Sequence, residues 1–126
     1  MRLLLDTHVL IWALSAPKQL AAKARDAIAA EENDVFVSVV SPWELAIKGP
    51  REGIRIPDDL GAQLDRQSIE LLPVHLRHTE SLESMPHHHR DPFDRMLIAQ
   101  AITEGLTIIT ADRKLRDYPV SLMSAI

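Results

Sequence analysis

Short, mainly apolar runs alternate along the chain with longer stretches in which apolar residues recur at helical spacing. The run at residues 3–5 has the composition of a strand that is buried on both faces of a parallel sheet, and the runs at 35–40 and 106–109 predict two further strands. The stretches between these runs predict helices over residues 8–14, 19–30, 43–48, 58–67, 75–83 and 93–104. This alternation is typical of an α/β domain with a mainly parallel central sheet.

Two segments of the remaining chain predict further strands. Residues 69–74 are expected to form a short strand, and the tail at 119–126 is expected to add an edge strand. Residues 51–57 and 84–90 are predicted loops. Because no repeat, low-complexity tract or linker interrupts the pattern, residues 1–126 are interpreted as one domain.

Two predicted helices begin with an acidic or hydroxyl cap followed by proline. Asp91 is placed to cap the helix that Pro92 opens, and Asp94 then falls in its first turn, where the helix dipole favours a negative charge. Ser41 is placed to cap the helix over 43–48, with Glu44 at the position of a capping box. Helix capping is therefore an alternative explanation for all three carboxylates.

The composition is that of a globular domain, with 46% apolar and 25% charged residues. The chain has no cysteine, which excludes disulfides and cysteine-based zinc sites and favours a reducing cytoplasm. The apolar start is interrupted by Asp6 and His8, so we interpret it as a strand and a helix rather than a signal peptide. No apolar run reaches the ~20 residues of a membrane span.

Acidic residues follow each of the main predicted strands. Asp6 follows the first strand, Glu44 the second and Asp112 the last, while Asp91 and Asp94 open the helix that leads into the last strand. Because the carboxyl ends of parallel strands line one edge of a sheet, we expect these side chains to converge there. Two such charges ~4 Å apart repel by about 4 kcal/mol at an effective dielectric near 20. A divalent cation removes this penalty, and oxygen ligands favour Mg²⁺ or Mn²⁺.

A carboxylate site of this kind is typical of phosphodiester hydrolysis by metal-activated water. The net charge of −4 argues against binding of nucleic acid by bulk electrostatics, but it does not exclude a nuclease whose negative charges hold metal. Basic residues near the expected crevice either contact RNA phosphates or are simply solvated: Arg90, Arg95, Arg113 and Lys114. The run His87, His88 and His89 is assigned to an exposed loop, because consecutive residues do not easily aim three imidazoles at one ion.

The acidic segments together resemble PIN-domain ribonucleases, and more narrowly the VapC-type toxins of bacterial toxin–antitoxin pairs. The matching segments are Asp6 after LLL, Glu44 within SPWELAIK, Asp91 and Asp94 within HHRDPFDRMLIAQA, and Asp112 within IITADRKL. The resemblance implies a flavodoxin-like α/β/α sandwich and an endoribonuclease dependent on Mg²⁺ or Mn²⁺. It also implies a homodimer and neutralisation by a cognate protein antitoxin.

The resemblance implies four catalytic acids, of which three are Asp6, Glu44 and Asp112. Both Asp91 and Asp94 are available for the remaining position, and we favour Asp94 because it lies closer to the body of the helix. Asp91 is then a cap or an outer partner of the metal site. Hydroxyls at Thr7 and Thr110 are candidates for orienting water around the metal.

Two other functions were weighed against this one. A phosphatase with Asp6 as nucleophile usually needs a second acid two residues later, where this chain has His8. A switch domain that binds Mg²⁺ needs a lysine after the last long strand, where Thr110 and Asp112 flank an alanine instead. The phosphatase also leaves Glu44 and Asp91 without a role.

Overall fold

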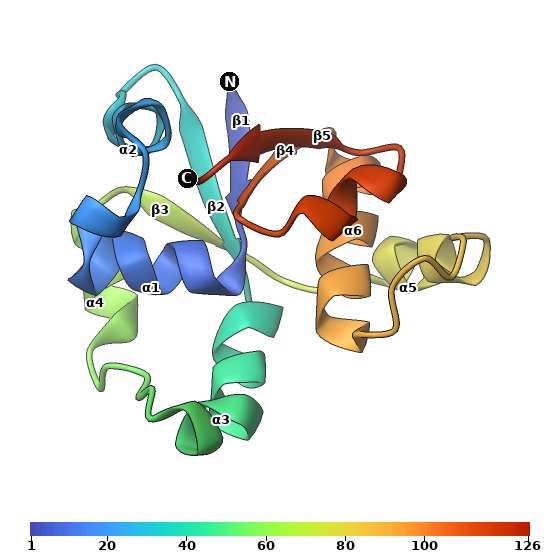
Figure 1. Cartoon of the computed structure of the whole chain (residues 1–126), viewed down its shortest axis with the longest axis horizontal. Helices are drawn as coiled ribbons and strands as arrows, with labels where there is room; N and C mark the ends of the chain where they lie inside the picture. The colour runs from blue at the N-terminus through green and yellow to red at the C-terminus, as the bar shows by residue number, and fades with distance from the viewer.

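Five strands form a single sheet in which every neighbouring pair is parallel. The computed structural model describes residues 1–126, and its strands run in the order β3-β2-β1-β4-β5 (Figure 1). Their bounds are β1 Arg2–Leu5, β2 Asp34–Ser38, β3 Ile69–Leu72, β4 Thr107–Thr110 and β5 Ser121–Ser124. Successive strands are added on one side of β1 and then on the other, so the order reverses beside β1. The crevice at the carboxyl ends of β1 and β4 is therefore the expected ligand site of such a sheet.

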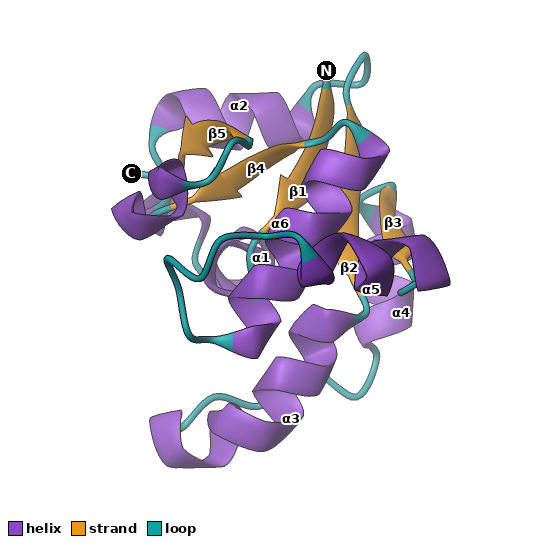
Figure 2. Ribbon diagram, turned by 90° about the vertical axis from the view of Figure 1, so that its right-hand side faces the viewer, coloured by secondary structure: helices purple, strands orange, loops and turns teal.

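Helices cover both faces of the sheet. Their bounds are α1 Thr7–Ser15, α2 Ala22–Ala29, α3 Val40–Glu52, α4 Leu60–Arg66, α5 Leu76–Glu83 and α6 Pro92–Glu104, with short 3₁₀ helices η1 Pro17–Gln19 and η2 Arg113–Asp117. The helices α1, α2 and α4 lie on one face, and α5 and α6 lie on the other (Figure 1). The helix α3 projects from the carboxyl edge of the sheet (Figure 2). None of the helices is long and apolar enough to cross a bilayer.

The central strand β1 is apolar at consecutive positions because both of its faces are buried. Leu3 and Leu5 pack into the core beneath α1, where Val9 is fully buried, whereas Leu4 packs on the opposite side against Leu97 of α6. This arrangement confirms the parallel α/β architecture predicted from the apolar runs.

The start of α6 follows its sequence signals. Asp91 is the N-cap, and its Oδ1 accepts hydrogen bonds from the main-chain N–H groups of Phe93 at 2.8 Å and Asp94 at 3.2 Å. Pro92 opens the helix, and Gly105 ends it in the left-handed conformation with φ 68°. The predicted helix is thus confirmed at both ends.

The predicted start of α3 is wrong. The strand β2 ends at Ser38 rather than residue 40, and α3 begins at Val40. The Ser38 hydroxyl accepts from the Val40 N–H at 3.0 Å and turns the chain there, so Ser41 lies inside the helix and caps nothing. The capping box predicted for Ser41 and Glu44 is therefore absent.

The predicted end of α3 is also wrong, because the helix continues through Gly49 and Pro50 to Glu52. Its last turn closes on Gly53, which is left-handed with φ 68°, and the N–H groups of Gly53 and Ile54 both donate to the Gly49 carbonyl. One proline near the end of a helix removes a single hydrogen bond, and this closing turn compensates for it.

The helix predicted over 19–30 is divided into η1 and α2. Leu20 and Ala21 between them are extended, because Leu20 is buried in the core and the Ala21 N–H donates to the Ala125 carbonyl at 2.8 Å. This contact with the end of the chain overrides the helical propensity of the alanine-rich sequence. The tail does form the predicted edge strand, β5.

Candidate active site

Asp6 lies where β1 ends and caps α1. Its Oδ1 accepts from the Val9 N–H at 2.9 Å, and its Oδ2 accepts a short hydrogen bond from the Thr110 hydroxyl at the end of β4. Burial raises the pKa of Asp6 and the nearby Glu44 carboxylate adds to the rise, although the hydrogen bonds from Thr110 and Val9 oppose it. A buried carboxylate at the switch point of the sheet is thus held in place by the neighbouring strand.

Glu44 lies on the second turn of α3 with only 9% of its side chain exposed. Its Oε1 accepts from the Thr7 hydroxyl at 2.7 Å, and that hydroxyl is also 3.0 Å from Ser41 Oγ. The carboxylate is therefore oriented by α1, which begins directly after Asp6, rather than by the start of its own helix. The capping explanation for Glu44 does not apply.

Lys48 joins Glu44 to the start of α6. Its Nζ lies 2.9 Å from Glu44 Oε2 and 2.5 Å from Asp91 Oδ2, and it sits 5.1 Å from the centroid of the Phe93 ring. Desolvation lowers the pKa of Lys48, but the two carboxylates outweigh this effect and raise it. Lys48 is not among the residues that the sequence patterns indicate, although its i,i+4 spacing from Glu44 is a signal for half of the bridge.

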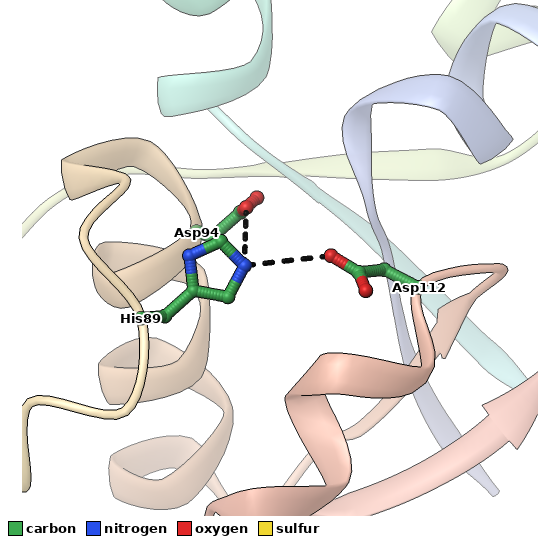
Figure 3. Close-up of side chains that lie close together, drawn as sticks. All are labelled: His89, Asp94 and Asp112. Atoms are coloured by element: carbon green, nitrogen blue, oxygen red, sulfur yellow. Dashed lines mark hydrogen bonds and ion pairs between the residues drawn. The ribbon is translucent and has the colours of Figure 1, made fainter.

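Asp94 lies in the first turn of α6, and its carboxylate accepts no hydrogen bond from the protein. Burial is the main cause that raises its pKa to about 7, followed by repulsion from Asp91 and Glu44 and more weakly from Asp6. His89 opposes this rise, with its Nε2 3.5 Å from Asp94 Oδ2 (Figure 3). Asp94 is therefore the acid in the site that most lacks a compensating positive charge.

Asp112 completes the cluster from the loop after β4. It caps η2 by accepting from the Lys114 N–H at 2.9 Å, and its other oxygen lies 3.5 Å from His89 Nε2. One ligand atom from each of His89, Asp94 and Asp112 lies within 4.8 Å of the others (Figure 3). The structure thus brings Asp94 and Asp112 together with His89, whereas Asp6 and Glu44 lie outside this group and act on Asp94 through their charges.

The assignment of all three consecutive histidines to an exposed loop is wrong for His89. His87 and His88 are exposed, but the His89 side chain is only 16% exposed and points into the acidic site. The main-chain N–H of His89 donates to the Tyr118 hydroxyl at 2.8 Å, and its Nδ1 accepts from the Asp91 N–H at 3.3 Å. These bonds orient the imidazole, and neither has a local sequence signal.

The basic residues near the site divide into two groups. Arg95 is buried, and its guanidinium donates to the carbonyls of Leu82 and Pro86 and to the Tyr118 hydroxyl. These bonds give Arg95 a structural role, and the alternative that its charge is simply solvated is wrong. The other three, Arg90, Arg113 and Lys114, are exposed. Arg90 also lines an open hollow of about 550 Å³ together with His87 and His89.

The donor set fits a hard divalent cation. Carboxylate oxygens are the ligands that Mg²⁺ and Mn²⁺ prefer in proteins, and Asp94 and Asp112 supply them here. Besides burial, the neighbouring carboxylates of Asp91, Glu44 and Asp6 raise the pKa of Asp94, which a bound cation would oppose. Both oxygens of Asp91 are engaged, Oδ1 by the main-chain N–H groups at the helix start and Oδ2 by Lys48.

Comparison with known proteins identifies the family. Residues 3–120 match the PIN domain. The chain is 30% identical over 121 residues to "Ribonuclease VapC22" of Mycobacterium tuberculosis, covering 91% of this chain and 90% of that relative.

Two solved structures show the same fold. The first is VapBC2 from Rickettsia felis bound to a promoter DNA fragment, which has a TM-score of 0.72 and 16% identity, with 98% of each chain covered. The second is DNA-bound VapBC from Salmonella typhimurium, which has a TM-score of 0.65 and 16% identity, with 100% of this chain and 99% of that chain covered. The flavodoxin-like α/β/α sandwich is thereby confirmed. The chain belongs to the PIN-domain family, in its VapC-type ribonuclease branch.

Proposed function

We propose that this VapC-type protein is a toxin that hydrolyses RNA phosphodiester bonds at the acidic site, using Mg²⁺ or Mn²⁺. The observation that carries the proposal is the convergence of Asp6, Glu44, Asp94 and Asp112 at the carboxyl edge of the sheet, with the pKa of Asp94 raised to about 7. A divalent cation bound there activates water and stabilises the leaving oxygen. The crowded carboxylates supply the negative potential that retains such an ion.

The side chains take different parts in the proposed site. Asp6, Asp94 and Asp112 would hold the ion. Glu44 on α3 contributes a further negative charge, and the Thr7 hydroxyl at the start of α1 fixes the orientation of its carboxylate. Thr110 similarly fixes Asp6. Asp91 holds the start of α6 and leaves Asp94 free to face the ion, which supports the choice of Asp94 as the third acid.

The proposed substrate and partners follow from the family and from the surface. Exposed Arg90, Arg113 and Lys114 neighbour Asp91 and Asp112 in the chain, and they would contact the phosphates of an RNA substrate. The structurally similar proteins are VapBC complexes, which supports a cognate antitoxin as partner. We further propose a homodimer that acts in the cytoplasm.

The phosphatase alternative finds no support in the site. Both oxygens of Asp6 accept hydrogen bonds, and the His8 position, where a second acid would be needed, is exposed. The switch-domain alternative leaves the contacts of Glu44 and Asp91 with Lys48 without a role.

The test is cleavage of a mixed cellular RNA pool by the purified protein, with Mn²⁺ or with EDTA. We expect discrete fragments that require the metal and disappear in Asp94→Asn. The control variant is Asp26→Asn, because Asp26 is exposed on α2. Cleavage that survives both EDTA and Asp94→Asn would contradict the proposal.

A further inference from the structure

We propose that the Lys48 ammonium is a permanent second cation of the acidic site, so that the protein binds one divalent ion instead of two. This inference rests on the proposed metal-dependent function. It concerns how the charges of the site are divided between the protein and the metal.

Lys48 occupies a bridging position between two carboxylates. Its Nζ lies 2.9 Å from Glu44 Oε2 and 2.5 Å from Asp91 Oδ2, so it contacts one oxygen from each of two helices. In two-metal hydrolytic sites, the ions lie about 3.5–4 Å apart among shared carboxylates. A lysine ammonium is a compact point charge, and it offsets one of the two negative charges of such a carboxylate pair without a second ion.

The oxygens beside Lys48 are already occupied. Glu44 accepts from Thr7 through Oε1 and from Lys48 through Oε2. Asp91 accepts from two main-chain N–H groups through Oδ1 and from Lys48 through Oδ2. A second divalent ion at this end of the site would therefore have to displace the ammonium.

The opposite end of the site has the reverse character. Asp94 accepts no hydrogen bond, and the His89 imidazole is the only basic side chain paired with its carboxylate and with that of Asp112. Neither acid therefore has a lysine or arginine partner, in contrast to Glu44 and Asp91. One divalent ion at this end would leave the site with one cation for each group of carboxylates.

The surroundings of Lys48 favour a fixed position for its side chain. The Phe93 ring lies 5.1 Å from Nζ, and Trp43 packs edge-on against that ring with the centroids 4.9 Å apart. Only 35% of the Lys48 side chain is exposed. Lys48 is thus a positioning residue, which holds Glu44 and the start of α6 at a set separation.

The test counts the Mn²⁺ ions bound per chain, by isothermal titration calorimetry and by the loss of the free Mn²⁺ signal in electron paramagnetic resonance. The variants are Lys48→Met, which removes the charge but keeps the length, and Lys48→Arg, which keeps the charge. Lys23→Met is the control, because Lys23 is exposed on α2. Circular dichroism checks that each variant is folded.

We expect one Mn²⁺ in the wild type, Lys48→Arg and Lys23→Met, and two in Lys48→Met. Two ions in the wild type would overturn the inference while leaving the proposed function intact, even if Lys48→Met failed to fold. A single ion in folded Lys48→Met would also overturn it. No bound Mn²⁺ in the wild type would overturn the inference and the proposed metal centre together.

Discussion

Asp91 and Asp94 lie three residues apart at the start of α6, yet the pKa values of their carboxyl groups are shifted in opposite directions. Desolvation acts to raise the pKa of Asp91, but Lys48 and the main-chain N–H groups of the helix start outweigh it and hold the value below its usual range. Burial and neighbouring carboxylates raise the pKa of Asp94 to about 7. The helix start therefore carries one permanently charged acid and one acid that titrates near neutral pH.

The first prediction concerns the stability of the metal-free protein. Because the folded-state pKa of Asp94 lies above its unfolded value of 3.8, the neutral carboxyl stabilises the fold below about pH 4, and this contribution is lost as the pH rises through about 7. Asp94→Asn, which stays neutral, should unfold with a larger free energy than the wild type at pH 8. The upper bound of the difference is about 4 kcal/mol, at about 1.4 kcal/mol per pKa unit.

Urea denaturation in EDTA at several pH values between 4 and 8 measures this effect. The two proteins should converge toward pH 4. Asp91→Asn serves as the comparison and should be less stable than the wild type at pH 8, since it weakens a helix cap and an ion pair. A constant difference between Asp94→Asn and the wild type across the pH range would refute the assigned shift.

A second prediction concerns acid stability at the far end of α6. Glu104 forms two hydrogen bonds with the Arg77 guanidinium and one with buried His78, and these contacts lower its pKa from 4.5 to about 2. This stabilisation is present above about pH 4.5 and is lost as the pH falls toward 2. In Glu104→Gln, the fall in unfolding free energy between these values should be smaller than in the wild type. Exposed Glu83→Gln should retain the wild-type profile.

A third prediction compares two helical glycines. A Cβ at Gly49 would lie 2.5 Å from the Ile54 carbonyl oxygen, whereas a Cβ at Gly61 in α4 would meet nothing within 4 Å. Replacing a helical glycine by alanine normally stabilises by roughly 0.5–1 kcal/mol. We therefore expect Gly61→Ala to stabilise and Gly49→Ala to destabilise the fold in thermal or urea unfolding. A gain in stability for Gly49→Ala would contradict the close packing of this turn.

A fourth prediction concerns Tyr118, whose hydroxyl accepts from the His89 N–H and from the buried Arg95 guanidinium. Tyr118→Phe keeps the ring but leaves both donors without this acceptor, which should cost roughly 1–3 kcal/mol of unfolding free energy. Amide hydrogen exchange of residues 84–90 should also accelerate, because the loop loses its anchor. Unchanged exchange and stability would show that the bond does not hold His89 in the site.

Residues whose roles depend on local signals were predictable from the sequence. Asp6 and Asp112 follow apolar strands, and Asp91 precedes a proline at a helix start, so topology and capping alone place them at one edge of the sheet. The choice between Asp91 and Asp94 rested on their positions in the helix, and the opposite pKa shifts now support the same choice.

Residues whose roles depend on distant contacts were not predictable. Lys48 meets Asp91 across 43 residues, and His89 meets Asp112 across 23, and neither pairing has a periodic or capping signature. The bounds of α3 were missed for a related reason. The Ser38 hydroxyl accepts from the Val40 N–H and ends β2 before residue 40. The helix α3 ends at Gly53, which takes the left-handed conformation, and not at Gly49.

The most direct test of the central claim, that these carboxylates form one metal centre, is the melting temperature of the protein with and without Mn²⁺. At about 100 times the dissociation constant, Mn²⁺ should stabilise the wild type by about 2.7 kcal/mol, or roughly 10 °C for a domain of this size. Asp94→Asn should abolish most of this rise, and Asp26→Asn should retain it. An equal rise in all three proteins, or no rise in the wild type, would contradict the metal centre.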